Sequence, residues 1–115
     1  MENYKSRYSE EYRLNEYNKI IKKYPNKVPV IVCKSEYCTL DNIDKEKFLV
    51  PSDMTIGQFI YVIRKRINIE SHQALFITIN NSLQGSNKLM QEIYESNKDK
   101  DGFLYIKYTS ENTFG

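Results

Sequence analysis

The stretch from Thr55 to Ile67 restricts the fold of this chain more than any other. Thr55 and Gln58 have the spacing of a capping box, in which each side chain bonds a backbone N–H at the start of a helix. The apolar residues behind this cap recur at helical spacing and predict one apolar face: Ile56, Phe59, Ile60, Ile63 and Ile67. Three cations at 64–66 occupy the last turn, where they suit the helix dipole. Such a helix must pack its apolar face on another element.

Short runs rich in β-branched and aromatic residues predict the sheet on which this helix packs. The runs cover residues 28–33, 47–51, 75–79 and 103–108. Pro51 closes the second run and favours a strand at the edge of the sheet. Asn80-Asn81 and residues 99–102 predict turns. Between these turns we expect a short helix that Ser86 or Asn87 caps and that continues through Leu89, Met90, Ile93 and Tyr94.

Residues 4–24 carry spaced apolar side chains and predict one or two amphipathic helices that end before Pro25. With the elements above, the order becomes a helical arm, then β, β, α, β, α, β and a polar tail. A chain of 115 residues forms one domain. The fold class is therefore α+β, a roll in which one face of the sheet is covered.

Composition excludes several classes of protein. The net charge of +2 does not by itself require a nucleic acid partner. The polar start at 1–7 is not a signal peptide, and no apolar run approaches the roughly 18 to 20 residues of a membrane span. We therefore expect a cytoplasmic protein, in which Cys33 and Cys38 are free thiols.

Gly115 ends the polar tail at 109–115. A glycine carboxylate has no neighbouring Cβ, so it is the least hindered acyl group that a protein offers to an enzyme. This is the chemistry of a ubiquitin-like modifier, whose carboxylate is activated, passed to a thiol and then passed to an amine. A cloned fragment can also end at any glycine, so Gly115 alone does not establish this function.

Longer motifs carry a resemblance to a known family. They lie at 22–32, 48–59 and 63–67, and the strand Phe103-Leu104-Tyr105-Ile106 followed by Tyr108 adds a fourth. Together with the glycine at the end, they resemble the autophagy ubiquitin-like modifier family, to which GABA-receptor-associated protein and microtubule-associated protein light chain 3 belong. The likeness runs from about Glu16 to Gly115. It implies a ubiquitin-like β-grasp roll with an N-terminal helical extension, divided into an arm (1–24), a ubiquitin-like domain (25–108) and a conjugation tail (109–115).

The same resemblance implies a function without catalysis or cofactors. An activating enzyme would adenylate Gly115, and a conjugating enzyme would carry it as a thioester to phosphatidylethanolamine on the autophagosome membrane. A cysteine protease would remove the lipid, and cargo receptors with aromatic-x-x-aliphatic motifs would bind the protein, a monomer in solution. Two departures stand out. Nothing follows Gly115, where most members carry residues that a protease removes, and the arm has Glu10-Glu11-Tyr12-Arg13 where the family tends to have an aromatic residue before Glu-Lys-Arg.

The resemblance also implies a binding groove along residues 47–51, where an added peptide strand would place alternate side chains in two pockets. The pocket for the aromatic residue would be lined by Glu16, Ile20, Pro29, Ile31, Lys47, Leu49 and Phe103. The pocket for the aliphatic residue would be lined by Phe48, Val50, Pro51, Met54, Phe59, Val62 and Ile63. Acids that flank the motif would meet Lys27, Lys45, Lys47 and Arg66. From the pattern alone, Ile31, Phe59 and Ile63 are equally well explained as core residues.

Three other functions fit parts of the sequence. Residues 102–108 resemble the aromatic strand of an RNA-recognition motif, but Asp101 stands where that motif has a cation and Leu104 where it has Gly or Ala. An enzyme is disfavoured because the only histidine, His72, is far in sequence from both cysteines, and no metal-ligand spacing is present. A ubiquitin-like adaptor that binds motif peptides without being conjugated stays open.

Overall fold

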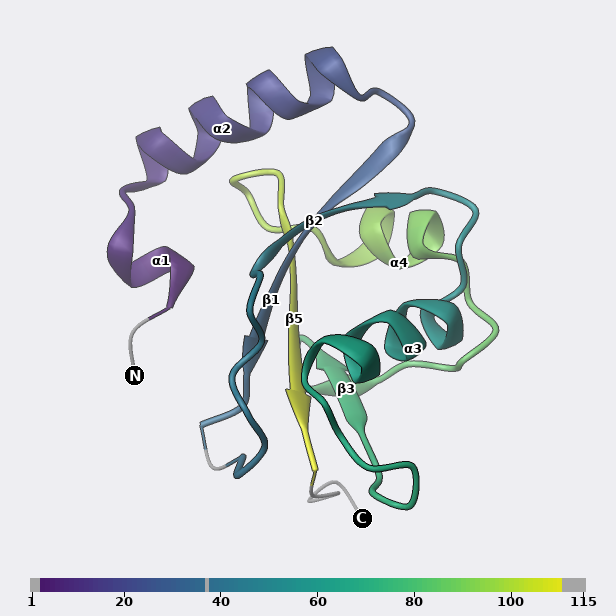
Figure 1. The fold of residues 1–115 in the computed structure, drawn as a ribbon. Coiled ribbons are helices and arrows are strands. Elements are labelled where there is room, and N and C mark those ends of the chain that lie inside the picture. Colours follow the sequence, from purple (N-terminus) through teal and green to yellow (C-terminus); the bar gives the residue numbers. More distant parts are fainter. Residues whose placement is uncertain (1–2, 37, 111–115) are drawn as a thin grey trace.

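The computed structural model describes residues 3–36 and 38–110. No helix within this part of the chain is long and apolar enough to cross a membrane. Its elements follow one another in the order shown in Figure 1: α1 Tyr4–Arg7, α2 Glu10–Lys23, β1 Lys27–Lys34, β2 Lys47–Pro51, α3 Ile56–Arg66, β3 Phe76–Ile79, β4 Ser82–Leu83, α4 Met90–Asn97 and β5 Leu104–Thr109. The predicted order of helices and strands is confirmed, and β4 is an addition to it. β5 includes Thr109, the first residue of the predicted tail.

The strands form one mixed sheet in the order β2-β1-β5-β3-β4. β5 lies in the middle, where it pairs in parallel with β1 and antiparallel with β3. β2 pairs antiparallel with β1 and forms one edge, as Pro51 indicated. Asn80 and Asn81 both have positive φ, a conformation that asparagine tolerates, and they turn the chain from β3 into the two-residue strand β4.

α3 has the predicted cap and the predicted apolar face. Thr55 accepts a hydrogen bond from the Gln58 N–H, and the Gln58 side chain accepts one from the Thr55 N–H. Ile56, Phe59 and Ile63 are buried against the sheet. The main core lies between the sheet and the two helices α3 and α4. Its fully buried members are dominated by Val, Ile and Leu side chains that alternate along the strands.

The prediction that Ser86 or Asn87 caps the last helix is wrong, because α4 begins at Met90. The segment 86–89 is not helical and runs beside the start of α3. The Ile56 N–H donates to the Lys88 carbonyl, and the Met90 N–H donates to the Met54 carbonyl. The Glu92 side chain accepts a hydrogen bond from the Leu89 N–H. The two backbone hydrogen bonds hold the segment 86–89 against the loop before α3, and the helix begins only after this segment.

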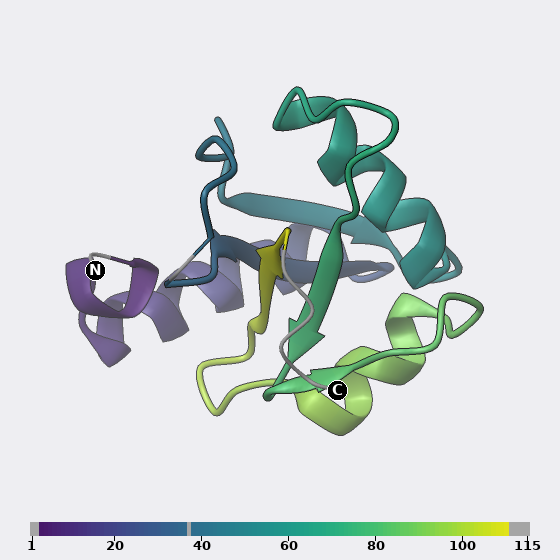
Figure 2. The ribbon, with the colours of Figure 1, turned by 90° about the horizontal axis from the view of Figure 1, so that it is seen from below.

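The second face of the sheet carries the N-terminal arm, so the expectation of a sheet covered on one face is also wrong. Figures 1 and 2 show α3 and α4 on one side of the strands and α1 and α2 on the other. Along β1, Val30 and Val32 enter the main core, whereas Ile31 points to the arm. There Tyr4, Ile31 and Phe103 form a separate buried cluster, hereafter the arm cluster. It is completed by partly buried side chains: Tyr8, Tyr17, Ile20 and Tyr105.

Candidate peptide-binding groove

β2 presents alternate side chains to the two faces of the sheet, as the alternation of residues 47–50 predicted. Phe48 and Val50 are buried in the main core, where the Phe48 ring packs edge-on against Phe59 of α3. Lys47 and Leu49 are half-buried on the opposite face, toward α2. Because β2 has β1 on one side only, the backbone groups on its other side lie at an open sheet edge.

A surface cavity of about 310 Å³ lies between α2 and β2. Four residues of the predicted aromatic pocket line it together: Glu16, Ile20, Lys47 and Leu49. The other four lining residues are Lys19, Lys23, Tyr24 and Lys45. The result is an apolar hollow, with Ile20 and Leu49 at its walls, ringed by four lysines.

Three residues of the predicted aromatic pocket do not line this cavity. Pro29 is buried in β1, and Ile31 and Phe103 are 1% and 0% exposed within the arm cluster. Ile31 and Phe103 lie below the arm. Pro29 and Ile31 are the register partners of Leu49 and Lys47, so these four side chains share one face of the sheet. The accessible hollow is thus the outer part of the predicted pocket, and its predicted inner part is covered.

Sequence reasoning did not assign Lys19, Lys23 and Tyr24 to this site. Lys19 and Ile20 stand three and four residues after Glu16, and Lys23 stands seven residues after it, so the four share one face of α2. Once Glu16 and Ile20 were placed in the pocket, helical periodicity alone would have added both lysines. Tyr24 is the residue at which α2 ends, one turn beyond Ile20.

Glu16 is the one acid among the described residues that line the hollow. Its carboxylate lies 3.4 Å from Lys47 Nζ and 3.4 Å from Lys19 Nζ. Burial acts to raise the pKa of Glu16, but hydrogen bonds and positive charge from Lys47 and Lys19 outweigh it and hold that pKa below its ordinary value. Glu16 therefore stays ionised, and its negative charge offsets part of the positive charge of the lysines that line the hollow.

The predicted aliphatic pocket lies where β2 meets α3. Phe48, Val50, Phe59 and Ile63 are buried in the main core. Three residues of this set are half-buried and reach the surface: Pro51, Met54 and Val62. This arrangement fits a role in the core for the four buried residues and a role in peptide binding for the three half-buried ones.

The cations predicted to meet flanking acids lie at the start of β1 (Lys27), just before β2 (Lys45) and in the last turn of α3 (Arg66). Lys27 is half-buried at the start of β1, next to Pro51 in the strand register. Lys45 and Arg66 are exposed and both lie over the Phe48 ring, with Lys45 Nζ 5.2 Å and Arg66 Cζ 5.5 Å from its centroid. Arg66 Nη1 also contacts Asp44 at 3.2 Å.

α2 forms one wall of the groove and is fixed to the sheet by a buried carboxylate. Asp101 is 0% exposed and accepts three hydrogen bonds. Arg13 Nη1 and the Tyr105 hydroxyl each donate to its Oδ2 at 2.5 Å, and the Phe103 N–H donates to Oδ1 at 2.9 Å. Burial and the bond to Asp101 raise the pKa of Tyr105. The network ties the arm to the turn before β5.

Gly102 allows α2 to approach that turn closely. Its φ is +93°, and a Cβ built there would lie 2.4–2.6 Å from three ring atoms of Tyr17. The Tyr17 ring thus occupies the space that any other residue would need for its side chain. The Gly102 carbonyl accepts a hydrogen bond of 2.7 Å from the Tyr94 hydroxyl, which ties α4 to the same point.

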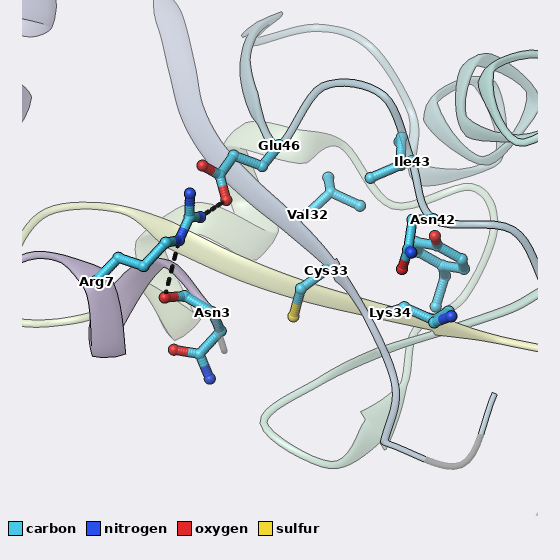
Figure 3. Close-up of a pocket in the computed structure, with 9 residues that line it drawn as sticks. Asn3, Arg7, Val32, Cys33, Lys34, Asn42, Ile43 and Glu46 are labelled. Atoms are coloured by element: carbon cyan, nitrogen blue, oxygen red, sulfur yellow. Dashed lines mark hydrogen bonds and ion pairs between the residues drawn. The ribbon is translucent and has the colours of Figure 1, made fainter. Parts of the chain in front are cut away.

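A second cavity, of about 440 Å³, lies between α1, β1 and the segment before β2 (Figure 3). Arg7 reaches across it from α1 to pair with Glu46. Cys33 lines it and is half-buried, whereas Cys38 is buried, and both thiols are free. Burial raises the pKa of the Cys33 thiol, which disfavours the nucleophilic thiolate. Within residues 3–36 and 38–110, no group of three or more His, Cys, Asp and Glu side chains could hold a metal ion. Gly115 lies outside the described residues.

A mixed β-sheet crossed by α3, with a helical arm on its second face and an open edge strand beside the arm, defines a ubiquitin-like protein with an N-terminal helical extension. The sequence profile of the family described as "Autophagy protein Atg8 ubiquitin like" matches residues 12–115. The chain belongs to the Atg8 family of ubiquitin-like autophagy proteins.

Relatives and solved structures agree with this assignment. Autophagy-related protein 8e of Arabidopsis thaliana is 54% identical over 105 residues, which cover 91% of this chain and 86% of that protein. Autophagy-related protein 8 of Vanderwaltozyma polyspora is 50% identical over 112 residues, with 97% and 95% covered. The crystal structure of Trypanosoma brucei ATG8 superposes with a TM-score of 0.92 at 41% identity and covers 100% of this chain and 99% of that one.

Another solved structure contains a bound peptide. Plasmodium falciparum Atg8 in complex with a Plasmodium falciparum Atg3 peptide superposes with a TM-score of 0.89 at 36% identity, and 97% of this chain and 98% of that chain are covered. The family resemblance and the β-grasp fold class inferred from the sequence motifs are therefore confirmed.

Proposed function

We propose that this protein is a modifier that is conjugated through Gly115 to phosphatidylethanolamine on autophagosomal membranes. It is the substrate of this reaction and not an enzyme. An activating enzyme adenylates the Gly115 carboxylate, a conjugating enzyme carries it as a thioester, and the lipid amine displaces the thiol. A cysteine protease hydrolyses the resulting amide bond, which releases the lipid and restores the free Gly115 carboxylate. The protein is a cytoplasmic monomer before conjugation and membrane-bound after it.

Two facts support this proposal. The chain belongs to the Atg8 family, and a P. falciparum member of that family has been solved with a peptide of Atg3. The lipid chemistry also fits stable anchoring, because burial of acyl chains contributes about 0.8 kcal/mol per CH₂ and one chain alone binds membranes only marginally. Phosphatidylethanolamine supplies two chains.

We further propose that the groove between α2 and β2 recruits cargo receptors and adaptors that carry aromatic-x-x-aliphatic motifs. The observation that carries this proposal is the open edge strand β2 beside a hollow lined by Ile20, Lys47 and Leu49. A peptide added to β2 gains main-chain hydrogen bonds, and every second side chain points to the sheet face with the hollow. The surrounding lysines favour peptides with acidic flanks.

We expect Lys47→Ala combined with Leu49→Ala to weaken binding of an aromatic-x-x-Leu peptide at least tenfold, which corresponds to about 1.4 kcal/mol. The change removes one apolar wall and one cation of the hollow, and it leaves the buried neighbours Phe48 and Val50 in place. Isothermal titration calorimetry measures the affinity, and circular dichroism verifies the fold.

The matched control replaces one lysine and one leucine outside the groove. Lys88 and Leu83 are both exposed, and neither lines the hollow. We expect Lys88→Ala with Leu83→Ala to change the affinity by less than twofold. Equal affinities for wild type and the Lys47/Leu49 variant would reject the groove as the binding site.

The conjugation step is tested by the intact mass of the membrane-associated protein from starved cells. We expect an increment equal to phosphatidylethanolamine, mapped to Gly115 and absent from Gly115→Ala. If wild type carries no adduct when autophagy is induced, the remaining function is the unconjugated adaptor, which binds motif peptides through the groove alone.

A further inference from the structure

Tyr24 differs in its surroundings from the other exposed tyrosines of the described residues. Tyr12, Tyr24 and Tyr61 are 44%, 39% and 59% exposed. Tyr12 stacks on Tyr8, and Tyr61 lies on α3 beside Lys65. Neither of these two tyrosines lines the hollow between α2 and β2, whereas Tyr24 does.

The hollow beside Tyr24 carries more positive than negative charge. Four lysines and one carboxylate line it, an excess of three positive charges. Glu16 contacts two of these lysines. The remaining two, Lys23 and Lys45, form no ion pair with the described residues, and Lys23 Nζ lies 5.6 Å from the centroid of the Tyr24 ring. An anion attached to that ring would therefore meet cations that have no acidic partner.

The Tyr24 hydroxyl is available for modification without loss of a structural contact. It makes no hydrogen bond to the described residues. The Tyr24 backbone ends α2, where its N–H donates to the Ile20 carbonyl and its carbonyl accepts from the Lys27 N–H. Pro25 and Asn26, which follow it, are exposed. A modifying enzyme can therefore reach the ring, and the hydrogen bonds that hold this residue do not involve its side chain.

The end of α2 alone would not favour an anion at Tyr24. The last carbonyls of a helix carry partial negative charge, and an acidic group placed near them is destabilised. The lysines that line the hollow therefore have to supply the stabilisation, and their removal is the direct test of it.

We propose that Tyr24 is a phosphorylation site, and that its phosphate changes the preference of the groove from motif peptides with acidic flanks to motif peptides with neutral flanks. This proposal rests on the peptide-binding function proposed above. A protein tyrosine kinase transfers the γ-phosphoryl group of ATP to Tyr24 Oη, the phenolic proton is released, and ADP leaves. The phosphate carries a charge of about −1.5 to −2 at pH 7 and pairs with the cations that an acidic flank would otherwise meet.

The apolar part of the groove keeps its contacts in the phosphorylated protein. Ile20 and Leu49 line the hollow and carry no charge, and the open edge of β2 stays available for an added strand. The phosphate thus removes the electrostatic contribution of the lysines and repels acids, while apolar and main-chain contacts persist. The result is a change in preference and not a general block.

The binding test uses protein with phosphotyrosine at position 24, made by genetic incorporation of the modified amino acid. Calorimetry compares a Trp-x-x-Leu peptide preceded by three glutamates with the same peptide preceded by three serines. We expect phosphorylation to weaken binding of the glutamate peptide at least fivefold and of the serine peptide less than twofold. Tyr24→Phe keeps the ring and cannot be phosphorylated, so it should bind both peptides as wild type does.

Phosphotyrosine at position 61 is the matched control. Tyr61 is exposed and lies 4.5 Å from Lys65 Nζ, but it does not line the hollow. Its phosphorylation should change the affinity for either peptide by less than twofold.

Phosphorus-31 NMR tests whether the lysines hold the phosphate. Nearby cations favour the dianion, so the second pKa of the phosphate should be lower at position 24 than at position 61. Lys23→Ala combined with Lys45→Ala should raise that pKa toward the value at position 61. A second pKa that is equal at the two positions would overturn the assigned site.

Phosphopeptide mapping of the protein from growing and from starved cells, with phosphatases inhibited, tests whether the modification occurs. We expect phosphate on Tyr24 in at least one of the two conditions. Its absence from both, an unchanged affinity for the glutamate peptide, or an equal loss for both peptides overturns this proposal and leaves the groove in place. If the unmodified protein binds neither peptide, the proposed groove fails as well.

Discussion

Replacement of Gly102 by alanine should lower the free energy of unfolding by about 3 kcal/mol or more. Two independent effects add at this position. A non-glycine residue at a φ of +93° is strained, which costs about 1–3 kcal/mol. The new methyl group would also lie 2.4–2.6 Å from the Tyr17 ring, and overpacking of this kind costs about 1–3 kcal/mol. Urea denaturation of the purified protein measures the change.

The chain offers both a control and a double-mutant test for this prediction. A Cβ at Gly85 would meet only Asn87 Oδ1, at 3.4 Å, so Gly85→Ala should change stability by less than about 1 kcal/mol. Gly102→Ala should destabilise a Tyr17→Ala protein less than it destabilises wild type, because the clash is then absent and only the backbone strain remains. Similar stabilities for the two glycine variants would contradict the close approach of α2.

We expect Asp101→Ala to destabilise the protein by roughly 3–5 kcal/mol, the range found when one partner of a buried ion pair is removed. Asp101 is 0% exposed, and its loss leaves the Arg13 guanidinium, the Tyr105 hydroxyl and the Phe103 N–H without their acceptor. Because the pair joins the arm to the sheet, loss of arm helicity should precede global unfolding. Hydrogen exchange of the α2 amides measures that order.

A neighbouring exposed ion pair tests whether burial, and not charge alone, accounts for the effect of Asp101→Ala. Lys100 Nζ lies 3.3 Å from Glu10, and both side chains are largely exposed. Glu10→Ala removes a negative charge from the same contact between arm and turn, and we expect a loss of about 1 kcal/mol or less. If Glu10→Ala and Asp101→Ala had equal effects, the buried network would not be what holds the arm.

The elements with strong local signals could be predicted from the sequence, whereas features that depend on contacts between distant segments could not. α3 and the strand β2 followed from a capping box, helical spacing and a terminal proline. α4 was predicted to start too early, because residues 86–89 bond the backbone near Met54 and Ile56, and no local pattern encodes that contact. The covered second face was missed for the same reason. Arg13 and Asp101 are 88 residues apart in sequence, so their pairing is invisible before folding.

The candidate site shows a similar division. Glu16, Ile20, Lys47 and Leu49 came from the resemblance, and the structure brings them to one hollow. Helical periodicity would have added Lys19 and Lys23. Ile31 and Phe103 were also assigned to the pocket, and the structure places both in the arm cluster; their burial depends on where α1 docks, which is a tertiary property. The roles of these residues in binding stay predictions.

The place of β5 in the sheet has a consequence for how the protein is made. Among the strands of the described residues it is the last to be synthesised, yet β1 and β3 both pair with it. Until residues 104–109 emerge, the apolar strands at 27–34 and 76–79 have no shared partner and remain available to other chains. Pairing Val30 with Leu104 also closes a long loop, which slows folding. The sheet can therefore be completed only after residues 104–109 have emerged, and a product that stops before Leu104 should lack the central strand and fail to fold.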